Sequence, residues 1–352
     1  EDKITHATDN GAYGFIRVNA GNVFVTTNSG SIQRGVNAAT AGNTLWITAG
    51  EFAENVTVNK ALTIRGAQWG ADADTRYAAF IGGKANTAVE TVLTAATNNP
   101  TGGNPGANDL LRTLANNITV DGLVIDGNNV TLGASTSVLD GVDVHARRGI
   151  TNVSDTNVAT PVSNLVIQNN VIQNFGQRGI SLSNDGTVGT GNLITGNVIH
   201  NFAQQGIILF TNAYADITDN TIVNNVYGTI GLHLQNFYIA APTAMNWTGN
   251  NIEIGAFGIG IHTNLFYANG GTLNISGNTV NAEAIAVTAD DTWGINVWSV
   301  ANSAVVNVSN NTIGSSGGTF SRGINVWNVL PGLANISVGT IGNSDVCVYV
   351  DN

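Results

Sequence analysis

The chain has 352 residues and a formal net charge of −11, with 43% hydrophobic and 10% charged residues. This composition excludes a disordered chain, which needs low hydrophobicity and high charge. The acidic balance argues against nucleic acid and anionic membrane surfaces as partners. No apolar run is long enough for a membrane span, and the single cysteine, Cys347, excludes an internal disulfide.

The N-terminal part predicts a short amphipathic helix over residues 31–42. Ser31 is a candidate N-cap, Ile32 and Val36 lie four residues apart, and Gly42 ends the segment. Strands are expected next at 44–48, 55–58 and 62–65. Such a helix would cap the first coils of a repeat structure. We therefore expect N-terminal strands and a capping helix over residues 1–43, followed by one continuous domain over residues 44–352.

A short sequence motif, called here the first phrase, recurs from residue 141 onward. In it a first residue, usually glycine, precedes alternating apolar and variable positions. The copies begin at Gly141, Gly179, Gly206, Gly231, Gly258, Gly294, Gly323 and Asp345. No helical pattern separates them, so each strand must pair with its own copy in the next repeat. The sequence therefore predicts an all-β fold, a single-stranded right-handed parallel β-helix with two aliphatic columns in its core.

A second phrase, between these copies, ends in a turn that contains an asparagine. The equivalent asparagines are Asn170, Asn197, Asn220, Asn250, Asn278 and Asn311. Stacked amides can hydrogen-bond to one another and to the turn backbone, and asparagine tolerates a left-handed backbone. We interpret these residues as a structural ladder inside the solenoid.

The segment 31–66 resembles the opening of pectate-lyase-superfamily β-helices, with a capping helix followed by strands that end in a glycine turn. The later phrases resemble the superfamily's parallel β-helix repeats, so the resemblance covers essentially the whole chain. It implies the fold but no single activity, because the superfamily includes lyases, epimerases, glycoside hydrolases, adhesins and surface solenoids. The Tyr-Gly-x-Asp-Pro-His motif of its mannuronan epimerases is absent, since Thr-Ile-Gly follows Tyr227-Gly228.

The last variable position of each phrase would form an outward column rich in rings. Its aromatic and imidazole members are Phe210, His262, Trp298, Trp327 and Tyr349. Aromatic faces pack against the C–H faces of sugars, so this column is a candidate carbohydrate-binding strip. The alternative is that loops cover the rings, which then only pack.

Residues for proton transfer occur on the same predicted strands. His233 and His262 lie on successive coils, two places apart along the strand, while Asp143, His145 and Arg147 cluster on an earlier coil. A lyase or epimerase of uronate polymers needs a base, a proton donor and a cation for the carboxylate. Against this, the acidic chain predicts an electrostatically poor groove for an anionic polymer. Packed or solvated roles for these residues are the alternative.

The acidic pair Asp290 and Asp291 is a weak candidate for a metal site and could bind calcium. The sequence predicts no other cofactor. The alternative is a solvated loop.

These patterns favour an extracellular or cell-surface module, bacterial or archaeal, with a structural or adhesive role. Its expected partners are a polysaccharide or a neighbouring surface protein. Because the last phrase, 345–352, is itself a strand, head-to-tail self-association is also expected. The alternative is a polysaccharide-active enzyme working in a groove along the β-helix, either a lyase or C5-epimerase or, after these, a glycoside hydrolase.

Overall fold

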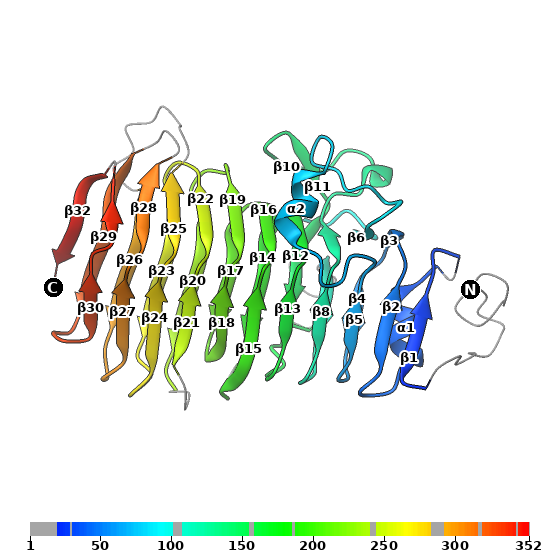
Figure 1. The fold of residues 1–352 in the computed structure, drawn as a ribbon, viewed down its shortest axis with the longest axis horizontal. Helices are drawn as coiled ribbons and strands as arrows, with labels where there is room; N and C mark the ends of the chain where they lie inside the picture. Colours follow the sequence, from blue (N-terminus) through cyan, green and yellow to red (C-terminus); the bar gives the residue numbers. More distant parts are fainter. Residues whose placement is uncertain are drawn as a thin grey trace.

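The structure, a computed structural model, describes residues 20–28, 30–100, 108–154, 158–184, 187–239, 244–282, 292–315, 319–342 and 344–351. They form a right-handed parallel β-helix whose strands stack along one long axis (Figure 1). Each regular coil contributes one strand to each of three faces. The predicted all-β solenoid is confirmed. Residues 1–19 lie outside the described part, and the division at residue 43 stays a prediction.

The first face is a sheet of eleven parallel strands. Its strands are β1 (Asn22–Val25), β2 (Thr44–Ile47), β5 (Thr63–Arg65), β8 (Thr119–Asp121), β13 (Val166–Gln168), β15 (Gly189–Thr195), β18 (Ala213–Thr218), β21 (Met245–Thr248), β24 (Thr272–Ser276), β27 (Val305–Ser309) and β30 (Ala334–Ser337). Their side chains alternate between the core and the outside, as a half-buried sheet requires.

The other two faces are joined because β14 (Val171–Ser183) runs through both. The second face contains β3 (Gly50–Ala53), β6 (Thr91–Thr94), β9 (Val124–Asp126), β16 (Val198–Phe202), β19 (Thr221–Asn224), β22 (Asn251–Ile254), β25 (Thr279–Ala282), β28 (Thr312–Ser315) and β31 (Thr340–Ile341). The third face contains β4 (Val56–Val58), β7 (Asp109–Thr113), β12 (Ala146–Thr151), β17 (Gln205–Phe210), β20 (Ile230–Phe237), β23 (Ile259–Phe266), β26 (Trp293–Val300), β29 (Phe320–Val329) and β32 (Ser344–Asp351).

The predicted capping helix is confirmed as α1 (Ile32–Ala38). The Ser31 side chain accepts a hydrogen bond from the Arg34 backbone N–H and so forms the N-cap. Ile32, Gly35 and Val36 form its buried side. A Cβ at Gly35 would collide with Val25 and Leu45, so glycine lets the helix pack closely on the first coils.

The asparagine ladder is also confirmed. From Asn170 to Asn311 each side-chain amide donates to the next amide oxygen at 2.9–3.0 Å. The same oxygen accepts the backbone N–H of the preceding ladder residue. Because every amide both donates and accepts, the buried ladder satisfies itself.

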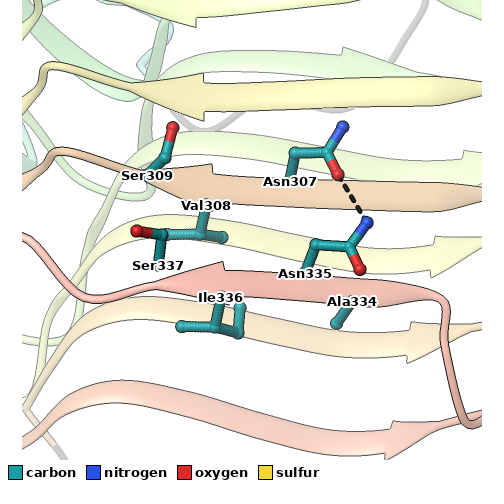
Figure 2. Close-up of a pocket in the computed structure, with 7 residues that line it drawn as sticks. All are labelled: Asn307, Val308, Ser309, Ala334, Asn335, Ile336 and Ser337. Atoms are coloured by element: carbon teal, nitrogen blue, oxygen red, sulfur yellow. Dashed lines mark hydrogen bonds between the residues drawn. The ribbon is translucent and has the colours of Figure 1, made fainter.

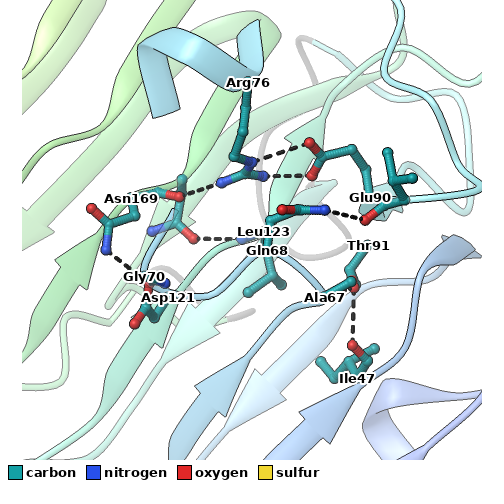
Figure 3. A network of polar contacts seen from close by, with 12 residues as sticks. Ile47, Ala67, Gln68, Gly70, Arg76, Glu90, Thr91, Asp121, Leu123 and Asn169 are labelled. Atoms are coloured by element: carbon teal, nitrogen blue, oxygen red, sulfur yellow. Dashed lines mark hydrogen bonds and ion pairs between the residues drawn. The ribbon is translucent and has the colours of Figure 1, made fainter. Parts of the chain in front are cut away.

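The second face is covered near its N-terminal end by α2 (Ala73–Ala78), an insertion that the sequence pattern did not reveal. Ala73 packs with Val92, Val124, Val171 and Val198 in a cluster outside the main core. A polar network fastens the helix (Figure 3). Arg76 makes a bidentate pair with Glu90, at 3.1 and 2.6 Å, and donates to the Asn169 carbonyl oxygen at 2.6 Å. Helix α2 and its polar network therefore cover this part of the second face.

The strand register shows that the copy of the first phrase predicted to begin at Gly141 is wrong. Residues 142–144 do not belong to the stacked column; they form β11 (Val142–Val144), which pairs antiparallel with β10 (Ser137–Leu139). A short 3-10 helix, η1 (Val130–Leu132), precedes this hairpin. The true copy begins at Gly149, since Ile150 pairs with Ile180.

Two further copies are displaced by two residues. Leu232 pairs with Ile261, not with Ile259, and Ile324 pairs with Val348, not with Val346. A shift of two keeps every apolar residue on the same face, so alternation alone cannot detect it.

No helix in the described ranges is long and apolar enough to cross a membrane.

Candidate functional site

The third face carries three rows of side chains outside the core, of which the second and third alternate with core residues such as Ile180 and Leu182. The first row is Arg148, Arg178, Gln205, Ile230, Ile259, Trp293, Arg322 and Val346. The second row is Thr151, Ser181, Ile208, His233, His262, Asn296, Asn325 and Tyr349. The third row is Ser183, Phe210, Gln235, Asn264, Trp298, Trp327 and Asp351. We call them the arginine row, the histidine row and the tryptophan row.

Four arginines gather around one buried carboxylate at the N-terminal end of these rows. Asp109 is fully buried and accepts two hydrogen bonds from Arg147, at 2.9 and 2.8 Å. Arg112 and Arg148 each place Nε 3.8 Å from an Asp109 oxygen. Arg178 pairs in register with Arg148 on the next coil. Asp109 therefore contacts three guanidinium groups, and that of Arg178 lies on the next coil.

The guanidinium groups of Arg148 and Arg178 are largely removed from water. Burial, aided by the neighbouring arginines, lowers the pKa of Arg148 to about 10, and the same causes lower the pKa of Arg178 to about 10. Both groups stay charged at neutral pH. A guanidinium group that is partly removed from water and has no ion pair among the described residues, such as that of Arg178, is stabilised by an added anion.

A cavity of about 180 Å³ opens at this cluster. It is lined by Arg148, Val153, Ala159, Arg178, Ser181, Ser183 and Phe210. The Arg178 guanidinium carbon lies 4.9 Å from the Phe210 ring centroid, and Arg178 Nε donates to Gln205 at 2.7 Å. The ring and the amide hold the guanidinium in place, as an anion-binding arginine requires.

The two histidines stack directly, which corrects the predicted offset of two places. His233 pairs in register with His262, and their ring centroids lie 4.7 Å apart. Both His233 ring nitrogens are buried and have no hydrogen-bond partner among the residues that the structure describes. His262 Nδ1 lies 3.0 Å from the Asn296 amide nitrogen.

Both imidazoles are neutral at pH 7. Burial, the neighbouring His262 and Arg178 together hold the pKa of His233 well below 6.5, and burial lowers the pKa of His262 to about 4. A neutral imidazole with a free nitrogen can accept a proton.

Two of the three earlier candidates, Asp143 and His145, lie outside the three rows, whereas Arg147 belongs to the arginine cluster. Asp143 lies in the β10–β11 hairpin and accepts from the Ser135 backbone N–H at 3.1 Å. His145 is fully buried; its Nδ1 accepts from the Asn129 N–H and its Nε2 faces the Gly133 carbonyl oxygen at 2.8 Å. Arg147 is the bidentate partner of Asp109. These contacts leave Asp143 and His145 outside the histidine row.

The predicted aromatic strip is divided between two rows. Phe210, Trp298 and Trp327 lie in the tryptophan row, whereas His262 and Tyr349 lie in the histidine row. The two tryptophan rings are nearly parallel, at 8°, with centroids 5.5 Å apart, and His262 stacks on the other side of Trp298 at 6.0 Å. The two tryptophans stack because coils in register place equivalent side chains side by side, whereas His262 reaches Trp298 from the neighbouring row. Trp327 remains 46% exposed.

Neither a metal centre nor a second candidate site emerges from the described residues. Asp290 and Asp291 lie outside them, and within them no group of three or more His, Cys, Asp or Glu could hold a metal ion. A hollow of about 430 Å³ lies over β27 and β30 (Figure 2). Its lining residues are Asn307, Val308, Ser309, Ala334, Asn335, Ile336 and Ser337. None of these is ionisable, so the hollow offers hydrogen bonds but no acid–base chemistry.

Sequence reasoning missed Asp109, Arg112 and Arg178. A signal was present, because arginine directly precedes the glycine at Arg148-Gly149, Arg178-Gly179 and Arg322-Gly323. These glycines share one column, in which a Cβ would lie 2.5–2.8 Å from the backbone oxygen of the next coil. When the repeats of the sequence are aligned on this glycine column, the three arginines fall in one row. The net charge of the chain therefore does not describe the third face, where arginines gather in one row.

These observations define a right-handed parallel β-helix protein whose third face carries rows of cationic and aromatic side chains. Among solved structures, it is similar to an alginate lyase from Paenibacillus sp. str. FPU-7, with a TM-score of 0.52, 14% identity, and coverage of 94% of this chain and 98% of that one. It is also similar to the A-module of a mannuronan C-5 epimerase from Azotobacter vinelandii (TM-score 0.41, 16% identity, coverage 90% and 91%). A third is a surface adhesin of Streptococcus pneumoniae (TM-score 0.43, 10% identity, coverage 90% and 88%). At these identities the likeness shows the fold alone. No protein-family model and no curated protein matches the chain.

Proposed function

We propose that this β-helix acts as an enzyme on an acidic polysaccharide along its third face, as a lyase or a C5-epimerase of uronate residues. The observation that carries the proposal is the pair Arg148 and Arg178, whose guanidinium groups lie in register on neighbouring coils and line a cavity. A uronate carboxylate is the planar anion that paired guanidinium groups bind best. An alginate lyase shares the fold over nearly the whole chain, which supports this substrate class without assigning any residue.

His233 is the candidate base. Arg178 is one of the groups that lower its pKa, so a carboxylate bound to Arg178 would offset that effect and strengthen the base. His233 would then take the C5 proton of the uronate. In a lyase the electron pair left on C5 forms the C4–C5 double bond while the C4–O bond breaks, and the leaving oxygen takes a proton from water. In an epimerase a proton returns to C5 from the opposite side.

The adhesive or structural interpretation remains the second candidate, supported by the exposed Trp327. This interpretation requires that the protein binds a polysaccharide without converting it. An extracellular or cell-surface location and self-association stay predictions under either function.

The test is incubation with alginate, polygalacturonate and hyaluronan, followed by ultraviolet absorbance of unsaturated products and by NMR of the uronate residues. We expect turnover of at least one polymer, reduced about 100-fold or more in Arg178→Gln and in His233→Asn. Arg34→Gln, on α1, is the matched control and should keep full activity. Binding without turnover would favour the adhesive interpretation, and absence of both would overturn the proposal.

A further inference from the structure

A second arginine on the same face is held in the same way as Arg178. The guanidinium carbon of Arg322 lies 3.8 Å from the Tyr349 ring centroid and 5.5 Å from that of Trp293. Its Nη1 donates to Asn325 Oδ1 at 2.7 Å. Arg178 has one ring, Phe210, where Arg322 has two, and it likewise has one amide partner. Neither arginine has an ion pair with a carboxylate in the described part of the chain, so each keeps N–H groups for an anion.

Arg178 and Arg322 lie in one row. The register runs from Arg178 through Gln205, Ile230, Ile259 and Trp293 to Arg322, which is five steps. At the spacing of neighbouring strands, five steps span about 24 Å. The positions between the two arginines are uncharged. The row therefore offers cationic positions near both ends, Arg148 and Arg178 at one and Arg322 at the other, and none between Arg178 and Arg322.

We propose that Arg322, with Trp293 and Tyr349, is a distant carboxylate subsite for the same acidic polysaccharide, which lies along the β-helix axis. This inference rests on the proposed function and adds the length and direction of the substrate. A chain that reaches both arginines must cover about 24 Å, or about six sugar residues when one residue matches one coil, because five steps join six positions. A polymer with a carboxylate on each residue meets both ends, whereas a disaccharide or trisaccharide reaches only one.

The experiment compares uronate oligomers of the polymer that binds best, from the trimer to the octamer, by calorimetry and tryptophan fluorescence. Affinity should rise once the oligomer reaches about six residues. Arg322→Gln should weaken the octamer about tenfold, the loss of one charge-assisted contact, and should leave the trimer unchanged. Arg178→Gln should weaken both lengths, and Arg34→Gln neither.

The outcomes separate the two proposals. If Arg178→Gln weakens both oligomers while Arg322→Gln weakens neither, or both to the same extent, the distant subsite is wrong and the proposed function stands. If no acidic oligomer binds, or Arg178→Gln has no effect, the proposed function itself fails. Circular dichroism and thermal unfolding of Arg322→Gln confirm that the variant is folded. Arg322→Lys, which keeps the charge but loses the planar fork, should recover part of the octamer affinity.

Discussion

The internal asparagine ladder and the third face use the same repeat geometry with opposite results. In the ladder an amide stacks on an amide, and every donor meets an acceptor on the next coil. On the third face a guanidinium follows a guanidinium, and His233 stacks on His262 with both of its ring nitrogens unpaired among the described residues. An amide is self-complementary, whereas like charges and neutral imidazoles are not. The ladder stabilises the solenoid. The buried charges and unpaired imidazole nitrogens of the third face lower the stability of the fold, and a purely structural coil would not need them.

The largest expected effect tests the ladder. Asn220→Ala removes side-chain bonds to the Ile194 and Thr218 carbonyl oxygens and to Asn250, and it leaves the Asn197 amide without its acceptor. We expect the free energy of unfolding to fall by about 4 kcal/mol, because several buried polar groups lose their partners together. Urea denaturation measures it.

The matched control is Asn335→Ala, which removes an exposed amide that donates to Asn307 on the first face. It should change stability by less than about 0.5 kcal/mol. Equal effects of the two substitutions would contradict the distinction between the buried ladder and the surface.

The second effect is a pH dependence of stability carried by the histidine row. Below pH 6.5 the unfolded chain protonates its histidines, whereas folded His262, whose pKa is about 4, stays neutral. Stability is therefore fully present above pH 6.5 and is lost as the pH falls towards 4, by about 3 kcal/mol for this residue. His262→Asn, which copies Asn296 and Asn325 of the same row, should remove this contribution.

The measurement is denaturant unfolding of the parent and of His262→Asn at about pH 7.5 and about pH 4.5. The variant should lose less stability than the parent between the two pH values. His233 titrates in the same direction, so some dependence should remain in the variant. Identical losses in both proteins would show that the buried imidazole is not the cause.

The smallest effect concerns the tryptophan row. Trp298 and Trp327 stack at 5.5 Å, and such ring pairs contribute about 1 kcal/mol beyond their burial. A double-mutant cycle with Trp298→Leu and Trp327→Leu should give a coupling energy of that size. The control cycle combines Trp298→Leu with Trp46→Leu on the first face and should give none. A vanishing coupling in the first cycle would mean that the rings contribute independently.

Much of the fold could be predicted because local patterns carry it. The Ser31 cap, the alternation of Ile180 and Leu182, and the spacing of the ladder asparagines all report on nearest neighbours or on strand period. The site was harder to predict, since its members come from different coils. Asp109 and Arg147 are far apart in the sequence and meet only when β7 pairs with β12. Arg178 was overlooked because the composition of the chain is acidic. The net charge of a protein does not describe the charge of one of its faces.

The sequence by itself determined the solenoid, its in-and-out alternation and its internal ladder, because these follow from side-chain type at a fixed period. Only the tertiary structure decided which residues share a row. A shift of two residues leaves every apolar side chain in the core, so alternation permits several registers. The glycine column selects one of them, because a Cβ at positions such as Gly260 would collide with the next coil. That register places His262 on His233 and Arg178 beside Arg148, and so creates the candidate site.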